Sequence, residues 1–408
     1  MRRLTAREWG LLAMLVASIA LNYIDRSNLS LAAPVMQKEF TLSPAEMGKL
    51  FSAFFWTYAL FQLFGIAGWL ADRFPVGWVL AAGLFAWSAA TVLTGVLSGF
   101  AALFAVRLLV GAGESVAYPC YSRIFATEIP PEHRGLGNAL VDAGSKLGPA
   151  FGTLVGGLLL ARFGWRAFFL LLGVASLLWL VPWGIWMPRS RALQVSVAAE
   201  GPSTIEILRQ RSAWGAFFGH FCGNYFWFFL LTWLPSYLVN ERGFSLERMT
   251  GITSAAFLAI ASATVSAGWI SDRWLASGAS ATRVRKTVVV CGLSFSTVIF
   301  PVAFIQNSRA AVVLLFAACL AYGSYTSNHW AITQTLSGPL AAGRWTSLQN
   351  GVGNLAGVAA SWLTGLIVDR TQSYALAFVV ASAVVVTGAL MWGAVVGPIR
   401  EVEWRKSS

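Results

Sequence analysis

Charged residues are scarce in this sequence, and their scarcity excludes an ordinary water-soluble fold. Of the 408 residues, 11% are Asp, Glu, Lys or Arg, and 57% are apolar. Soluble domains carry roughly 25% charged residues. So little charge cannot cover the surface of a soluble protein of this length, and we expect the chain to lie in a lipid bilayer.

Cysteine and histidine are also rare, with four and three residues. The cysteines lie in apolar segments and lack the spacing of metal ligands, so we expect no disulfide framework and no bound metal. The histidines, His133, His220 and His329, are far apart in the sequence. A membrane enzyme would need a nucleophile with its base or a metal cluster. We therefore expect no enzymatic activity and no cofactor.

Apolar segments of about 20 residues, the length that crosses a bilayer, recur along the whole chain. Strands of a membrane barrel would alternate with period two over about ten residues, and these segments do not. We therefore predict an all-α membrane protein with twelve transmembrane helices. The expected spans are about 9–33, 48–71, 77–97, 99–121, 137–160, 166–187, 214–239, 250–271, 286–305, 309–333, 346–368 and 374–397.

The net charge of +12 is best interpreted as membrane topology. With the N-terminus inside, the basic residues concentrate in the cytoplasmic segments, which is the positive-inside bias. An even number of spans then places both termini in the cytoplasm. Residues such as Arg283, Arg285 and Lys286 are expected to contact anionic lipid headgroups rather than nucleic acid. Compact loops and short termini favour a bacterial inner membrane.

A repeated motif divides the chain into two related halves. GWLADRF at residues 68–74 returns as GWISDRW at residues 268–274. A long polar connection lies between the sixth and seventh spans. We predict an N-terminal six-helix bundle at 1–187, a cytoplasmic linker at 188–212 and a C-terminal bundle at 213–408. Parallel repeats of this kind predict a cavity between two bundles that rock to give alternating access.

Six charged residues interrupt the apolar spans of the first half. Each would cost about 2.5 to 3.5 kcal/mol at the bilayer centre, so we expect them to face a cavity or a partner. Two pairs share a helical face: Arg107 with Glu114 are seven residues apart, and Asp142 with Lys146 are four apart and can pair directly. The full set is Asp25, Arg26, Arg107, Glu114, Asp142 and Lys146.

These charges suggest proton coupling. Burial disfavours the ionised form of a carboxyl group, whereas a neighbouring arginine favours it. An incoming anion that competes for Arg26 or Arg107 would let Asp25 or Glu114 keep a proton. The alternative is a static ion-pair network that fixes helix packing, and for Asp142 and Lys146 the two interpretations are equally supported.

The second half offers neutral polar groups instead. The candidates for binding a hydroxyl-rich substrate are Asn224, Asn328 and Asn354, because amides both donate and accept hydrogen bonds. Hydrogen bonding between helices explains each of them equally well.

The motifs resemble those of known transporters. The repeated GxLADR motif is the cytoplasmic-loop signature of the major facilitator superfamily, which implies that Asp72 and Arg73, with Asp272 and Arg273, belong to the gate. LNYIDRSNLS in the first span and RLLVGAGESVAYP from Arg107 are similar to the anion:cation symporter family. That family includes galactonate, hexuronate and glucarate transporters and sialin.

The resemblance implies proton-coupled symport of a small organic anion, such as a sugar acid, by a monomer. It further implies that Asp25 and Glu114 bind protons and that Arg26 binds the substrate carboxylate. Tyr23, Tyr58 and Asn354 match expected substrate contacts, and Arg107 is expected to pair with Glu114.

The fifth span, VDAGSKLGPAFG, departs from the sugar-acid pattern. Lys146 adds a cation that either binds a second carboxylate or only neutralises Asp142. The glycines of this span and Pro149 partly resemble the motif of proton-coupled antiporters, so efflux is the alternative function. A cavity with three cations argues against a carrier of lipophilic cations.

Overall fold

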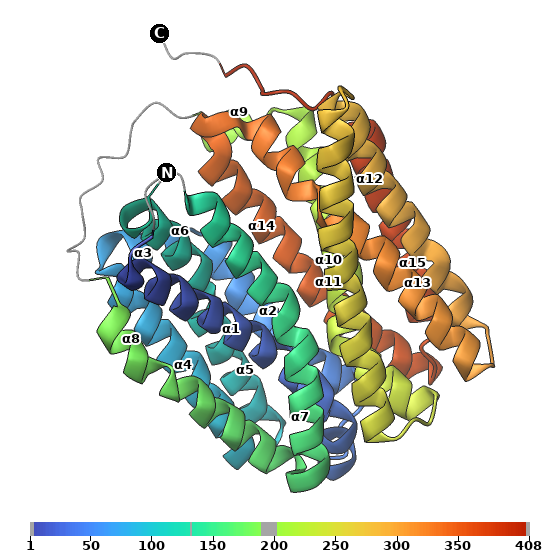
Figure 1. Cartoon of the computed structure of the whole chain (residues 1–408). Helices are drawn as coiled ribbons and strands as arrows, with labels where there is room; N and C mark the ends of the chain where they lie inside the picture. Colours follow the sequence, from blue (N-terminus) through green and yellow to red (C-terminus); the bar gives the residue numbers. More distant parts are fainter. Residues whose placement is uncertain (1–3, 131–132, 189–201, 405–408) are drawn as a thin grey trace. The chain divides into compact units, whose positions relative to one another are not determined.

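The computed structural model describes residues 4–130, 133–188 and 202–404, and these residues contain helices and no strand (Figure 1). They form two compact units. Unit 1 holds the described residues up to Pro188 together with Thr232–Ala255, and unit 2 holds those from Pro202 to Leu231 and from Ala256 to Trp404. Most of the predicted linker at 188–212 lies outside the described residues.

The helices of the first half are α1 (Ala6–Glu39), α2 (Pro44–Leu63), α3 (Ile66–Arg73), α4 (Val76–Val96), α5 (Phe100–Ser115), α6 (Ala117–Glu128), α7 (Arg134–Leu178) and α8 (Leu180–Trp186). The remainder of the chain contains α9 (Thr204–Leu208), α10 (Arg211–Ser236), α11 (Leu246–Ala276), α12 (Ala281–Ser296), α13 (Ser308–Thr326), α14 (His329–Thr371) and α15 (Ala375–Leu390). Short π- or 3₁₀-helical segments follow α10, α12 and α15.

Among the described residues, nine helices or joined helices are long and apolar enough to cross a membrane, and the bent pair of α2 and α3 adds a tenth. One of the nine, Leu140–Trp186, turns back at Gly164, whose φ of 79° only glycine adopts freely. It therefore contains two passes. The 26 residues of α10 are also long enough to span. The all-α membrane fold is as predicted, and these lengths are consistent with twelve spans.

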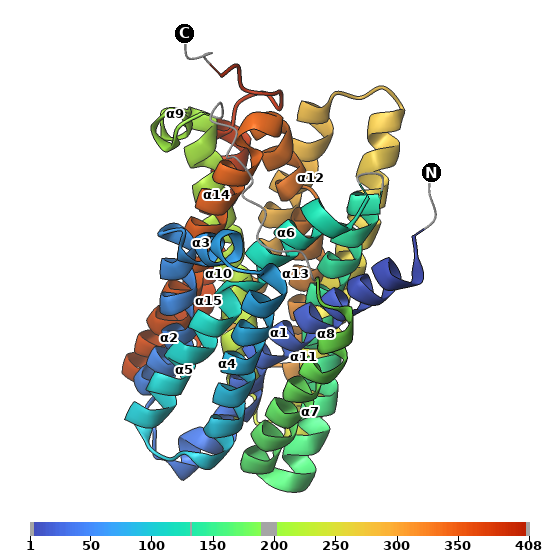
Figure 2. The ribbon, with the colours of Figure 1, turned by 90° about the vertical axis from the view of Figure 1, so that its left-hand side faces the viewer.

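A stripe of glycines lets α7 pack closely against α1. A Cβ atom added at Gly144 would lie 2.8 Å from a side-chain atom of Ile19, and one added at Gly148 would lie 2.8 Å from the backbone oxygen of Ala20. The two helices lie side by side in both views (Figures 1 and 2). Small residues at such spacing allow close helix approach in membranes. Helix packing thus explains these glycines of the antiporter-like motif.

Gly148→Ala is expected to destabilise the protein. The added methyl group would meet the backbone of Ala20, which cannot rotate away, and overpacking of this kind costs about 1 to 3 kcal/mol. The melting temperature in detergent should therefore fall. Gly184→Ala in α8 is the matched control, because a Cβ atom there meets nothing within 4 Å. Equal melting temperatures for both variants would contradict the packing role.

The fourth span is broken between α5 and α6 at Val116. A break inside a membrane leaves backbone carbonyls that need other donors. Gln62 of α2 supplies one, because its Nε2 atom donates to the carbonyl oxygen of Ser115 at 2.8 Å. The break therefore sits next to Glu114, in a region that α2 holds in place.

Candidate functional site

A buried ion pair joins the first and fourth spans. Nε of Arg26, on α1, donates to Oε2 of Glu114, on α5, at 2.8 Å. The two side chains are 3% and 0% exposed. A charge-assisted hydrogen bond in such a dry environment is strong, and removing either partner would leave an uncompensated charge. The charge state of Glu114 therefore depends on whether Arg26 is bound to it, and the availability of Arg26 to another anion depends on the charge of Glu114.

Three aromatic rings surround the guanidinium of Arg26. Its Cζ atom lies 4.6 Å from the ring centroids of Tyr23 and Tyr58 and 5.2 Å from that of Phe54. Aromatic faces attract cations at these distances. The hydroxyls of Tyr23 and Tyr118 lie 3.4 Å apart. Four of the predicted residues, Tyr23, Arg26, Tyr58 and Glu114, thus converge on one buried site in unit 1.

The expected pairing of Arg107 with Glu114 is wrong for this structure. Glu114 contacts Arg26, and no nitrogen of Arg107 lies within 4.0 Å of a carboxylate oxygen among the described residues. Seven residues separate Arg107 from Glu114 by about 10 Å along the helix axis. The charge of Arg107 still acts on Glu114, but without a direct contact.

Asp25 is 1% exposed and is held by neutral groups. Its Oδ1 atom accepts from Nδ2 of Asn28 at 3.0 Å and from the hydroxyl of Thr91, on α4, at 3.2 Å. Sequence reasoning missed both donors. The position of Asn28, three residues after Asp25, was a usable signal, because residues so spaced share a helical face. Asp25 thus has hydrogen-bond donors of its own and makes no direct contact with the ion pair, although the charges of Glu114 and Arg107 act on it.

Asp142 and Lys146 form the direct pair that their spacing allows, with Nζ 3.5 Å from Oδ1. The side chains are 61% and 26% exposed. The physical reason is the register of α7. Gly144 and Gly148 face α1, and Asp142 and Lys146 lie on roughly the opposite side of the helix. Among the described residues, the pair therefore makes none of the direct contacts around Arg26.

The three predicted asparagines of unit 2 are held by neighbouring polar groups. Asn224 Nδ2 lies 3.2 Å from Nε2 of His220, one turn earlier on α10. Asn328 donates to the hydroxyl of Ser271, and Asn354 donates to the carbonyl oxygen of Asn350, each at 2.8 Å. These contacts show bonding within and between helices, one of the two interpretations that the sequence left open.

Two histidines that are distant in sequence stack in unit 2. The rings of His220 and His329 lie 4.9 Å apart at an angle of 17°, and Tyr325 stacks on His329 at 5.0 Å. Gly353 of α14 makes room for them, because a Cβ atom there would lie 2.2 Å from His220. This cluster, which adjoins Asn224, was not predicted. The spacing of four residues between His220 and Asn224 was the available signal.

The two units differ in their buried charges. The dipeptide Asn-Tyr occurs on both α1 (residues 22–23) and α10 (residues 224–225), but Ile24, Asp25 and Arg26 follow it on α1, whereas Phe226, Trp227 and Phe228 follow it on α10. Across the described ranges, the buried residues of unit 2 include no Asp, Glu, Lys or Arg. The buried Asp, Glu and Arg residues of the described ranges therefore all belong to unit 1.

The two copies of the loop motif make different contacts. Asp72, at the end of α3, forms an ion pair of 2.5 Å with Arg123 of α6, while Arg73 is exposed. In the second copy, Asp272 and Arg273 are exposed, and the guanidinium of Arg273 lies 3.8 Å from the centroid of the Trp269 ring. The first copy thus links two helix ends within unit 1.

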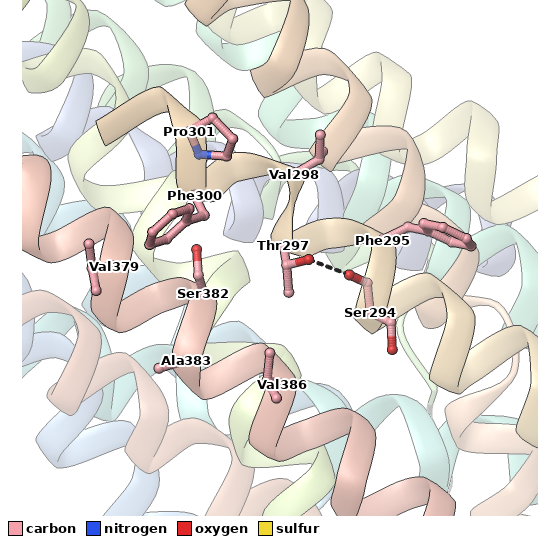
Figure 3. Close-up of a pocket in the computed structure, with 10 residues that line it drawn as sticks. All are labelled: Ser294, Phe295, Thr297, Val298, Phe300, Pro301, Val379, Ser382, Ala383 and Val386. Carbon is pink, nitrogen blue, oxygen red and sulfur yellow. Dashed lines mark hydrogen bonds between the residues drawn. The ribbon is translucent and has the colours of Figure 1, made fainter. Parts of the chain in front are cut away.

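A groove of about 630 Å³ in unit 2 lies apart from all the predicted site residues (Figure 3). Its lining is mostly apolar and comes from α12, the following 3₁₀ segment and α15. The hydroxyls of Thr297 and Ser382 donate to backbone oxygens. The groove therefore offers no cation to an anionic ligand.

Comparison with known proteins identifies the family. The family model described as "Major Facilitator Superfamily" matches residues 15–279, which is more than half of the chain. The chain belongs to the major facilitator superfamily. It is accordingly a multi-pass membrane transporter and not an enzyme.

Relatives within the superfamily are named as carriers of sugar acids. The chain is 29% identical to a probable galactarate/D-glucarate transporter of Bacillus subtilis, over 98% of this chain and 94% of the relative. It is 31% identical to a hexuronate transporter of the same organism, over 91% and 90%. A bacterial homologue of the human lysosomal transporter Spinster shares the fold, with a TM-score of 0.79, 17% identity and coverage of 96% and 97%.

Proposed function

We propose that this chain imports a small organic anion, a sugar acid or another carboxylate, in symport with protons. The observation that carries the proposal is the buried Arg26–Glu114 pair, which couples an anion receptor directly to a proton acceptor. The names of the sugar-acid relatives support the substrate class.

The proposed mechanism is a competition for Arg26. A substrate carboxylate that binds the guanidinium displaces Glu114, whose carboxyl group is then left without its cation in a dry site. Such a group keeps a proton rather than a charge. Tyr23 and Tyr58 hold the guanidinium in position throughout. Proton binding and anion binding therefore favour each other.

Asp25 is the second proton site in this proposal. The amide groups of Asn224, Asn328 and Asn354 form hydrogen bonds with the uncharged part of the substrate. Lys146 assists from the fifth span, and Asp72, Arg73, Asp272 and Arg273 act in the gate of an alternating-access cycle. The protein works as a monomer in a bacterial inner membrane, with both termini in the cytoplasm.

An inward proton gradient is expected to drive accumulation of the substrate. Purified protein in liposomes should concentrate radiolabelled sugar acids when the outside is made acidic, and a protonophore should abolish the accumulation. Protein-free liposomes are the control. If the gradient instead accelerated the exit of preloaded substrate, the chain would be an antiporter and symport would be excluded.

A further inference from the structure

Arg107 is a buried cation without a direct protein partner. It lies on α5 and is 5% exposed, and among the described residues it makes no hydrogen bond or ion pair. Its Nε atom is shielded from solvent and has no acceptor. A guanidinium buried in this way costs several kcal/mol unless an anion compensates it. Glu114 and Asp25 act on this guanidinium through their charges without a hydrogen bond to it, so its nitrogens remain available to an anionic group.

The guanidinium groups of Arg107 and Arg26 both lie near the aromatic ring of Phe54. The Cζ atoms of Arg26 and Arg107 are 5.2 and 5.4 Å from the ring centroid of Phe54, so their separation cannot exceed the sum of these two distances. A single small molecule can thus reach both. Planar guanidinium groups bind carboxylates in a bidentate manner, which suits both ends of a diacid.

Lys146 is less suitable as the second receptor. It is already paired with Asp142, and that pair is partly exposed. The charge of Lys146 is compensated by Asp142, whereas Arg107 has no carboxylate within ion-pair distance among the described residues. The second cation that the sequence suggested at Lys146 is therefore better assigned to Arg107.

Charge balance links the two arginines to the two buried carboxylates. Asp25, Glu114, Arg26 and Arg107 sum to zero charge when all are ionised. If both carboxyl groups are protonated, two positive charges remain, and a substrate of two negative charges restores neutrality. A buried site with net charge is costly, so the number of protons should match the charge of the substrate.

We propose that the substrate is a dianion, held at one end by Arg26 and at the other by Arg107, and carried with two protons in an electroneutral step. This inference rests on the proposed function and names the chemical class of its substrate.

The test compares D-glucarate, a six-carbon diacid, with D-gluconate, the monoacid with the same carbon chain. In liposomes with an imposed proton gradient, the wild type should transport glucarate with a kcat/KM at least about tenfold higher, since a second charge-assisted contact is made. Two protons should enter per glucarate, and a potassium diffusion potential should not change the rate. In Arg107→Gln the preference for glucarate should disappear, and Arg107→Lys should restore it in part.

The outcomes separate this inference from the proposed function. Equal transport of both acids by the wild type, or an equal loss of both in Arg107→Gln, would overturn the dianion assignment and leave proton-coupled symport intact. Uptake of neither acid by a wild type that elutes as a folded, monodisperse protein would contradict the proposed function itself.

Discussion

Arg26→Ala is expected to lower the kcat/KM of substrate uptake by more than about 100-fold. The substrate loses the guanidinium that binds its carboxylate, and two charge-assisted hydrogen bonds together contribute more than about 3 kcal/mol. Glu114 also loses the one ion-pair partner that it has among the described residues. Initial rates of proton-driven uptake in liposomes measure the effect. Arg309→Ala is the matched control, because Arg309 is exposed at the start of α13.

A folding defect must be separated from a binding defect in this variant. Breaking a buried pair by removing one partner costs about 3 to 5 kcal/mol, because the other charge is left buried. The double variant Arg26→Ala with Glu114→Gln removes that charge and should recover stability without recovering uptake. Arg26→Lys keeps the charge but not the planar fork, and should transport at an intermediate rate. Normal uptake by Arg26→Ala would contradict the assignment of the anion receptor.

Glu114→Gln is expected to abolish accumulation while preserving exchange. Glutamine has the shape of a protonated glutamate, so Arg26 stays available to the substrate, but no proton can be bound or released. One pH unit of gradient is worth 1.36 kcal/mol per coupled proton, enough for about tenfold accumulation. This contribution should vanish in the variant. Counterflow of labelled substrate measures exchange, and uptake under a pH gradient measures accumulation.

Glu247→Gln provides the matched control for this variant, since Glu247 is an exposed glutamate in the first turn of α11. It should behave as the wild type in both assays. The proton role of Glu114 would be excluded if Glu114→Gln accumulated substrate normally. Loss of counterflow as well would mean that Glu114 holds the site together instead of carrying a proton.

The membrane fold could be predicted from the sequence because apolar segments long enough to cross a bilayer recur along the chain. The motif GWLADRF, which returns as GWISDRW, further indicates two related halves. The buried charges of the first and fourth spans could be found for a similar reason, since an ionisable residue inside an apolar run has few structural solutions. Arg26 and Glu114 were placed at one site by resemblance and by their shared cost of burial. The structure adds their 2.8 Å contact.

The remaining features depend on helix rotation and on which helices are neighbours, and a single sequence does not encode these visibly. The seven-residue spacing placed Arg107 and Glu114 on one face but did not reveal that Arg26 reaches Glu114 first. The large exposed fraction of Asp142 could not be foreseen, because it depends on the glycine stripe that turns the other face of α7 toward α1. The stack of His220 on His329 joins residues over 100 positions apart.

The confinement of the buried charges to unit 1 has an evolutionary consequence. Among the described residues, the buried Asp, Glu and Arg side chains all lie in unit 1, and the Asn-Tyr dipeptide of α10 is followed by aromatic residues where that of α1 is followed by Ile24, Asp25 and Arg26. Under the proposed division of roles, substitutions on α10 and α14 change the substrate specificity and leave the proton-coupling residues of unit 1 unchanged. Substrate specificity can then evolve through substitutions in unit 2, while unit 1 keeps the residues that couple transport to protons.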